Sequence, residues 1–131
     1  MSRVRVHAFS VSLDGYGAGP DQDLDQPLGA GGMRLHDWVF TTRTGRAMIG
    51  EDGGDPGMDD DLVAAGFAGI GATVMGPNMF VDELHVAIVP VLLGGGERLF
   101  DDLDGGPVGY ERAELVGTAH AAHVRLVRTE D

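Results

Sequence analysis

Two short glycine-containing segments carry side chains that could do chemistry. In residues 94–98, Gly-Gly-Gly-Glu-Arg, consecutive backbone amides and the Arg98 guanidinium could hold an anion such as a phosphorylated substrate. The alternative is a flexible connection between two elements. In residues 12–15, Ser-Leu-Asp-Gly, the Asp14 carboxylate could orient or protonate a substrate, or Asp14 and Gly15 could simply form a turn.

The other acidic and histidine residues form no metal-binding pattern. Asp21, Asp23 and Asp25 alternate as in a calcium-binding loop. That loop would need glycine at its sixth position and glutamate at its twelfth, where this chain has Gln26 and Gly32. We therefore interpret the segment as a solvated acidic loop. The histidines lack the helical His-x-x-x-His spacing of a zinc site, and no Gly-x-Ser-x-Gly motif supports nucleophilic catalysis.

The elements that must position these residues are mostly strands. Val4–Val11 alternates and then becomes apolar, which predicts a first strand leading into the Asp14 segment. Leu84–Leu92 predicts a long apolar strand that the triple glycine ends. Alternation in Glu111–Thr118 and Ala122–Arg128 predicts a closing antiparallel pair.

One good helix is expected. Three consecutive aspartates, residues 59–61, precede the apolar segment Leu62–Ala68, and aspartates at a helix start can cap free N–H groups. Met33–Phe40 predicts a shorter helical patch. Thr41–Gly57 is polar and rich in glycine, and we expect it to be mobile.

The connection between two buried strands is too short for a parallel crossover. Ala72–Met75 and Leu84–Leu92 are apolar on both faces, which is typical of a sheet interior. Only the eight residues Gly76–Glu83 separate them, whereas a parallel connection needs a dozen or more. Either the two strands form a hairpin, or a crossover has been lost at Phe80–Val81.

Composition limits the class of protein. A length of 131 residues predicts one domain, residues 1–131. The net charge of −12, from 9 basic and 21 acidic residues, disfavours nucleic acid and anionic membranes as partners. There is no cysteine, no stretch near the ~18 apolar residues of a membrane span and no signal-peptide core. We expect a cytoplasmic protein.

Three segments, in this order and spacing, resemble one family. They are Val6–Gly17 with its Ser-Leu-Asp-Gly, Phe67–Phe80, and Val81–Phe100. Together they are similar to the dihydrofolate-reductase-like superfamily, above all to the reductase domain of the bacterial bifunctional riboflavin-biosynthesis deaminase/reductase and its stand-alone relatives. The resemblance covers nearly the whole chain. It implies an α/β fold with a mixed sheet and a closing antiparallel C-terminal hairpin, here shortened in the middle.

The resemblance also implies a function and a site. Family members of this kind are NADPH-dependent reductases, and the substrate would be a small pterin-like or ribosylamino-pyrimidine-like molecule, as in riboflavin biosynthesis. The residue matched to a catalytic role is Asp14. Cofactor-binding residues matched by position are Gly15, Tyr16, Gly76, Asn78 and Met79. Substrate-binding residues are Ser12, Gly94, Gly95 and Arg98. No metal is expected.

Two departures from the family keep a second hypothesis open. Pro77 stands where the family usually has an arginine that would pair with cofactor phosphate. Phe80 runs directly into Val81, where the family has further strands, helices and a Gly-Gly turn for the cofactor pyrophosphate. The chain could therefore be a shortened, non-catalytic remnant, or the stretch could be absent from this sequence alone. A single helix would leave one sheet face bare, so we expect a homodimer.

Overall fold

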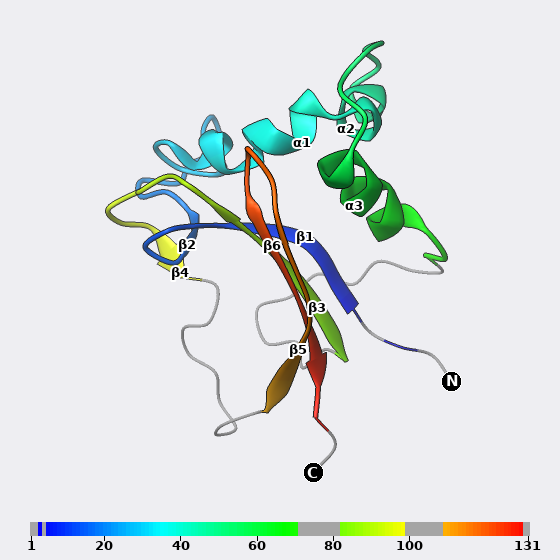
Figure 1. Cartoon of the computed structure of the whole chain (residues 1–131). Helices are drawn as coiled ribbons and strands as arrows, with labels where there is room; N and C mark the ends of the chain where they lie inside the picture. Colours follow the sequence, from blue (N-terminus) through cyan, green and yellow to red (C-terminus); the bar gives the residue numbers. More distant parts are fainter. Residues whose placement is uncertain (1–2, 4, 71–81, 99–108, 130–131) are drawn as a thin grey trace.

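The computed structural model describes residues 3, 5–70, 82–98 and 109–129. Its centre is a four-stranded sheet in the order β1 (Arg5–Ser12), β3 (Glu83–Val89), β6 (Ala122–Arg128) and β5 (Tyr110–Gly117). Strands β1 and β3 run parallel, and the other two pairs are antiparallel, so the sheet is mixed (Figure 1). The β5–β6 hairpin confirms the closing antiparallel pair that was predicted from the alternation in the sequence.

The first and third predicted strands form nearly where expected. Strand β1 lies within one residue of the predicted range, whereas β3 ends at Val89 and not at Leu92. Pro90 follows directly and has no N–H to donate to a neighbouring strand, which accounts for the earlier end. The predicted strand Ala72–Met75 and the Phe80–Val81 junction lie outside the described residues, so the shortened middle stays a prediction.

A second, two-stranded sheet was not expected. Strand β2 (Tyr16–Ala18) pairs antiparallel with β4 (Glu97–Arg98), so the segment after the triple glycine is not simply a flexible connection. Gly96 has φ of 129°, and a Cβ there would lie 1.9 Å from the Ala18 carbonyl oxygen. Only glycine allows the two strands to approach this closely at that position.

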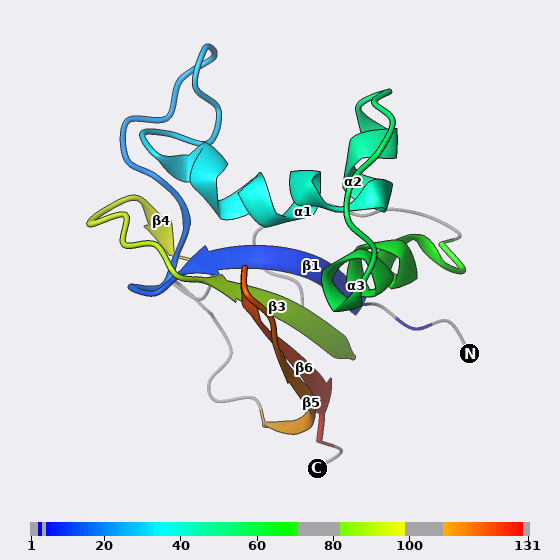
Figure 2. The same cartoon turned by 45° about the horizontal axis from the view of Figure 1, so that its top comes forward.

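The helices lie together over one face of the sheet. They are the 3-10 helix η1 (Gly32–His36), α1 (Asp37–Thr41), α2 (Arg43–Met48) and α3 (Met58–Phe67) (Figures 1 and 2). The helical patch at residues 33–40 is confirmed as η1 and α1. The segment after it, which the sequence suggested to be mobile, contains helix α2, and Thr42 begins this helix by accepting the Gly45 N–H at 2.9 Å.

Helix α3 forms as predicted, but its aspartates do not cap it. The N-cap residue is Gly57, and no side chain accepts a hydrogen bond there. Asp60 instead accepts the Thr44 N–H at 2.7 Å, near the start of α2. Asp59 is hydrogen-bonded to the sheet. The acidic first turn still suits the helix dipole, but its side chains hold neighbouring elements in place.

The sheet has an apolar cluster on each face. Under the helices lie Leu35, Trp38, Val63, Ala87, Val89 and Ala121. The other face gathers Val11, Leu84 and Val86 with partly buried neighbours Val6, Phe9, Ile88 and Leu126. Among the described residues all helices are on the first face, so homodimer formation through the second face stays a prediction.

Polar side chains are also buried under the helices, and all of them are paired. Ser10 and Trp38 are each 2% exposed, and the Trp38 indole N–H donates to Ser10 Oγ at 2.9 Å. Within the described part of the chain, no buried side-chain nitrogen or oxygen lacks a hydrogen-bond partner. These bonds avoid the cost of burying unpaired polar groups.

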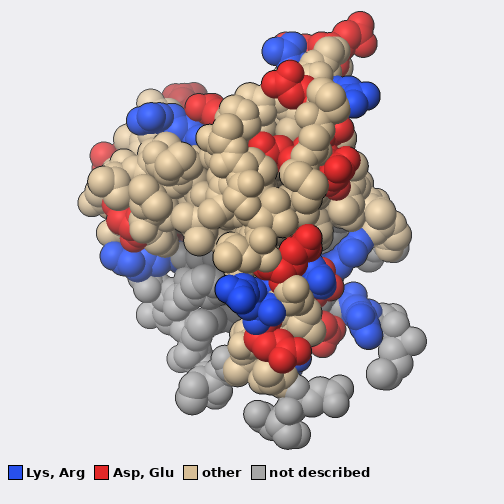
Figure 3. All heavy atoms as spheres, in the orientation of Figure 1, with Lys and Arg blue, Asp and Glu red and all other residues tan. Residues whose placement is uncertain are grey.

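The described surface carries charges of both signs. On the face seen in Figure 3, acidic and basic side chains lie near one another around the margins, and uncharged residues form a broad band between them. Among the described residues, no helix is long and apolar enough to cross a membrane.

The Trp38–Ser10 hydrogen bond gives a first prediction. Trp38→Phe removes the donor and leaves the buried Ser10 hydroxyl without it, which should lower the free energy of unfolding by about 1–3 kcal/mol. The double variant with Ser10→Ala should lose less than the sum of the two single variants, because neither polar group is then left behind. Urea unfolding measures all three, and strictly additive losses would contradict the coupling.

Candidate functional site

The parallel strands β1 and β3 end side by side. Ser12, the last residue of β1, pairs with Val89, the last residue of β3. In open α/β sheets the crevice beyond the carboxyl ends of parallel strands is the usual place for a ligand. Two groups of polar residues lie near this edge. We call them the Asp14 cluster (Ser12, Asp14, Tyr16, Leu93, Gly94 and Arg98) and the Asp59 pocket.

In the Asp14 cluster, the triple-glycine turn holds a carboxylate of the chain itself. Asp14 Oδ1 accepts hydrogen bonds from the Leu93 N–H at 3.1 Å and from the Ser12 hydroxyl at 2.6 Å. Asp14 Oδ2 accepts the Gly94 N–H at 2.7 Å. The Gly94 amide, which was expected to bind a substrate anion, therefore binds Asp14.

These hydrogen bonds favour the ionised form of Asp14. The Ser12 hydroxyl, followed by the Gly94 and Leu93 amides, lowers the pKa of the carboxyl group from 3.8 to about 2. A carboxylate with this pKa is a poor proton donor at neutral pH. The arrangement favours an orienting or structural role over proton donation.

Arg98 completes the Asp14 cluster. Its Nη1 donates to the Asp14 carbonyl oxygen at 3.4 Å and its Nη2 to the Tyr16 hydroxyl at 3.2 Å. The guanidinium carbon also lies 4.6 Å from the centre of the Tyr16 ring, a cation–π distance. Gly15, at φ of 89°, makes the turn that allows these contacts.

The structure thus brings together most of the predicted site residues that it describes. Direct contacts join Ser12, Asp14, Tyr16, Gly94 and Arg98, and Gly15 lies in the turn between Asp14 and Tyr16. Gly95 is the next residue after the Gly94 amide. The catalytic, cofactor-binding and substrate-binding roles assigned to these residues stay predictions. The remaining cofactor-binding residues, Gly76, Asn78 and Met79, lie outside the described residues.

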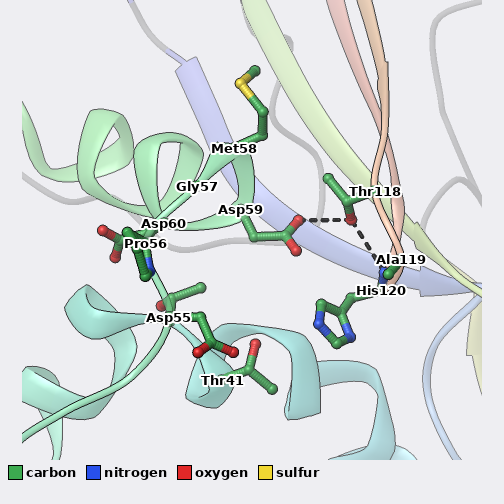
Figure 4. Close-up of a pocket in the computed structure, with 11 residues that line it drawn as sticks. Thr41, Asp55, Pro56, Gly57, Met58, Asp59, Asp60, Thr118, Ala119 and His120 are labelled. Carbon is green, nitrogen blue, oxygen red and sulfur yellow. Dashed lines mark hydrogen bonds between the residues drawn. The ribbon is translucent and has the colours of Figure 1, made fainter.

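The Asp59 pocket is a separate hollow of about 370 Å³ that the sequence did not indicate. It lies between the start of α3, the end of α1 and the turn between β5 and β6 (Figure 4). Its volume is at the lower end of the range for small-molecule sites. The residues around it are Thr41, Thr42, Asp55, Pro56, Gly57, Met58, Asp59, Asp60, Thr118, Ala119 and His120.

Asp59 is the side chain that links this pocket to the sheet. Its Oδ1 lies 2.6 Å from His123 Nε2 and accepts the Thr118 hydroxyl at 3.0 Å. The Asp59 side chain is 12% exposed and the His123 side chain 2% exposed. Both of these hydrogen bonds go to Oδ1, so among the described residues Oδ2 stays available to a ligand.

Two more carboxylates line the pocket. Asp55 is exposed, and its N–H donates to the Thr41 carbonyl oxygen at 2.8 Å, which holds the loop against the end of α1. The pKa of Asp60 is lowered, first by the Thr44 N–H and then by the Thr44 side chain. Asp60 also lies 4.0 Å from Arg43 Nε, which offsets part of its charge. The Asp59 and Asp55 carboxylates therefore set the charge of the hollow, and they favour a neutral or cationic ligand rich in N–H donors over a phosphate.

Sequence reasoning missed the Asp59 pocket because its residues are far apart in the chain. Asp59 and Thr118 are separated by 59 positions. One feature of the sequence could have indicated the site. A single side chain is enough to cap a helix, so three aspartates at the start of α3 are more than capping requires.

Among the solved structures similar to this chain is one described as a candidate riboflavin biosynthesis protein from Shewanella sp. PV-4, with 18% identity and a TM-score of 0.52. The match covers 97% of this chain and 99% of the other. No family model and no curated protein matches the sequence.

The chain has a dihydrofolate-reductase-like α/β fold. The mixed sheet, its closing hairpin and the likeness to the Shewanella protein agree on this. At this level of identity the likeness bears on the fold alone.

The cofactor that this fold family implies is NADPH, and its phosphates need amides or cationic groups. The Gly94 amide and the Leu93 amide next to it already bind Asp14, and Arg98 is held by Asp14 and Tyr16. The Asp59 pocket is acidic. These described residues do not fit a cofactor phosphate.

Acid unfolding tests the role of Asp14. Because its pKa is lowered in the folded state, its contribution to stability is present above pH 3.8 and is lost as the pH falls toward 2. Asp14→Asn cannot accept both amides, so it should lower the melting temperature at pH 7 and flatten the loss of stability across this interval. Circular dichroism at a series of pH values measures both effects.

The exposed Asp25→Asn is the matched control, since it removes one negative charge from a loop without touching the Asp14 cluster. If Asp14→Asn and the wild-type protein lose stability in parallel between pH 4 and pH 2, the Asp14 carboxylate does not hold the turn.

Proposed function

We propose that this chain is a reductase-type domain that binds a small pterin-like or aminopyrimidine-like substrate in the Asp59 pocket. The observation that carries the proposal is the Asp59 carboxylate. One of its oxygens is bonded to the sheet, and the other can accept N–H groups of a heterocycle. The likeness to the candidate riboflavin biosynthesis protein from Shewanella makes an aminopyrimidine of riboflavin synthesis the first substrate to test.

The charge around the pocket narrows the substrate further. Asp55 and Asp59 both line the pocket, so an added phosphate group on the ligand would be repelled. We expect the base of an aminopyrimidine to bind here and its phosphorylated form to bind less well. Thr118 and His120 add polar groups on the β5–β6 side of the pocket (Figure 4).

NADPH is the reductant that we propose, on the family resemblance alone. A second candidate function follows from the Asp14 cluster, where the chain's own carboxylate fills the glycine turn. In that case the protein is a non-catalytic domain that binds a heterocycle and does not use the cofactor.

Ligand binding tests the proposal. Calorimetric titration with 2,4-diaminopyrimidine should show binding that Asp59→Asn weakens about tenfold or more, because a hydrogen bond to a charged group contributes about 1.5–3 kcal/mol. Asp61→Asn is the matched control, since it removes the same charge from the same turn of α3 at an exposed position. Equal binding by the wild-type protein and Asp59→Asn would contradict the substrate site.

A cofactor titration separates the two candidate functions. A protein that binds NADPH with a Kd near 10 μM should gain about 2.7 kcal/mol of stability at 1 mM NADPH. Thermal unfolding with and without NADPH measures the gain. Heterocycle binding without any shift by NADPH would favour the non-catalytic domain.

A further inference from the structure

Three histidines from neighbouring strands form a row under the helices. His7 comes from β1, His85 from β3 and His123 from β6. His85 Nε2 lies 3.0 Å from His123 Nδ1, and His85 Nδ1 lies 3.4 Å from His7 Nδ1. With the 2.6 Å contact from His123 to Asp59, the row is a continuous chain of four side chains that ends at the pocket.

The carboxylate at one end sets the direction of every bond in this row. Asp59 can only accept, so His123 donates to it through Nε2–H, and a neutral His123 ring accepts at Nδ1. His85 then donates through Nε2–H to His123 and accepts at its own Nδ1. His7 must donate through Nδ1–H, which leaves His7 Nε2 as an acceptor at the far end.

The surroundings keep His85 and His7 neutral. Burial, followed by the charge of His7 and then that of His123, lowers the pKa of His85 to about 4. Burial and then Arg5 lower the pKa of His7 as well, while Glu83 acts in the opposite direction and Arg125 adds to the lowering. Neutral rings can pass a proton on by exchanging tautomers.

The two ends of the row lie in different surroundings. Asp59 lines the pocket, and His7 is only half-buried, whereas His85 is 1% exposed and His123 2% exposed. Gly66 of α3 packs over the His7 ring, and a Cβ there would lie 2.7 Å from His7 Nδ1. The absence of a side chain at residue 66 leaves His7 room to meet His85. Trp38 holds the other end, with its ring centre 4.9 Å from that of His123.

We propose that Asp59, His123, His85 and His7 form a proton relay between solvent and the Asp59 pocket. The proposal rests on the proposed function in one respect, that the pocket binds a ligand to which a proton is supplied. A reduction consumes a proton together with a hydride, so a buried route that delivers one to the pocket has a use there.

The step is a concerted shift of one proton. His7 Nε2 takes a proton from a hydronium ion in the solvent, which leaves as water, and the His7 Nδ1 proton passes to His85 Nδ1. The His85 Nε2 proton passes to His123 Nδ1, and the His123 Nε2 proton passes to Asp59 Oδ1. One proton enters, the carboxylate becomes a carboxylic acid, and no electrons are transferred. The Asp59 carboxyl group then turns its O–H toward the pocket to pass the proton to a ligand. The reverse shift, or reorientation of the rings after Asp59 has released its proton, restores the starting tautomers.

Nitrogen NMR of the histidine side chains tests the relay without any substrate. In the wild-type protein, His123 and His85 should carry the proton on Nε2, and His7 on Nδ1. His7→Phe should slow exchange of the His123 Nε2 proton with water at least tenfold. His36→Gln is the control, since this half-buried histidine lies outside the row, and it should leave the exchange unchanged.

Gly66→Ala is the second variant, and it decides the matter if His7→Phe does not fold. This variant keeps all four relay residues. The φ angle of Gly66 is not in the left-handed region, so the added methyl group should act chiefly by displacing the His7 ring. We expect the same slowing of exchange. Unchanged exchange in a folded variant, or a proton on Nδ1 of His85, would overturn the relay. Failure of the pocket to bind 2,4-diaminopyrimidine would overturn the proposed substrate and leave these NMR results unaffected.

Discussion

The contact between Asp59 and His123 joins the helical layer to the sheet. Asp59 lies in the first turn of α3, His123 lies in a central strand, and Thr118 in the adjoining turn donates to the same carboxylate oxygen. Because α3 has no side-chain cap of its own, this contact also fixes where the helix begins relative to β6. The wall of the pocket and the end of the histidine row both depend on it.

Burying such a row is costly unless every group in it is paired. A sheet face covered by helices is normally filled with apolar side chains, and each histidine placed there loses its hydration. In this chain the bonds between the rings and the bond from His123 to Asp59 replace that hydration. Apolar residues in these positions would serve the fold more simply, so the paired polar row is better explained by the chemistry of the site than by stability.

The features that could be predicted from the sequence are those that depend on local periodicity. Alternation located both strands of the closing hairpin, and the aspartate-rich start located α3. Helix α2 was missed because it depends on close packing against the end of α1. Its Gly45 lies against the Val39 carbonyl oxygen, where a Cβ would come within 1.9 Å, and nothing in the local pattern indicates this contact. Strands β2 and β4 have too few residues to show a period.

The candidate site was predictable only in part, for the same physical reason. The sequence placed residues 12–16 and residues 94–98 in one predicted site, because glycine turns and a carboxylate are visible as residue types, and the structure brings the two segments into contact. It could not indicate that these two segments would bind each other. A turn of free amides attracts any nearby anion, and in a folded chain a tethered carboxylate has a far higher local concentration than a dissolved phosphate. Asp14 therefore competes directly with any anionic ligand for the Leu93 and Gly94 amides, and a ligand could bind there only by displacing it. This competition favours a substrate that is recognised through its N–H groups at the Asp59 pocket over one that is held through its phosphate at the glycine turn.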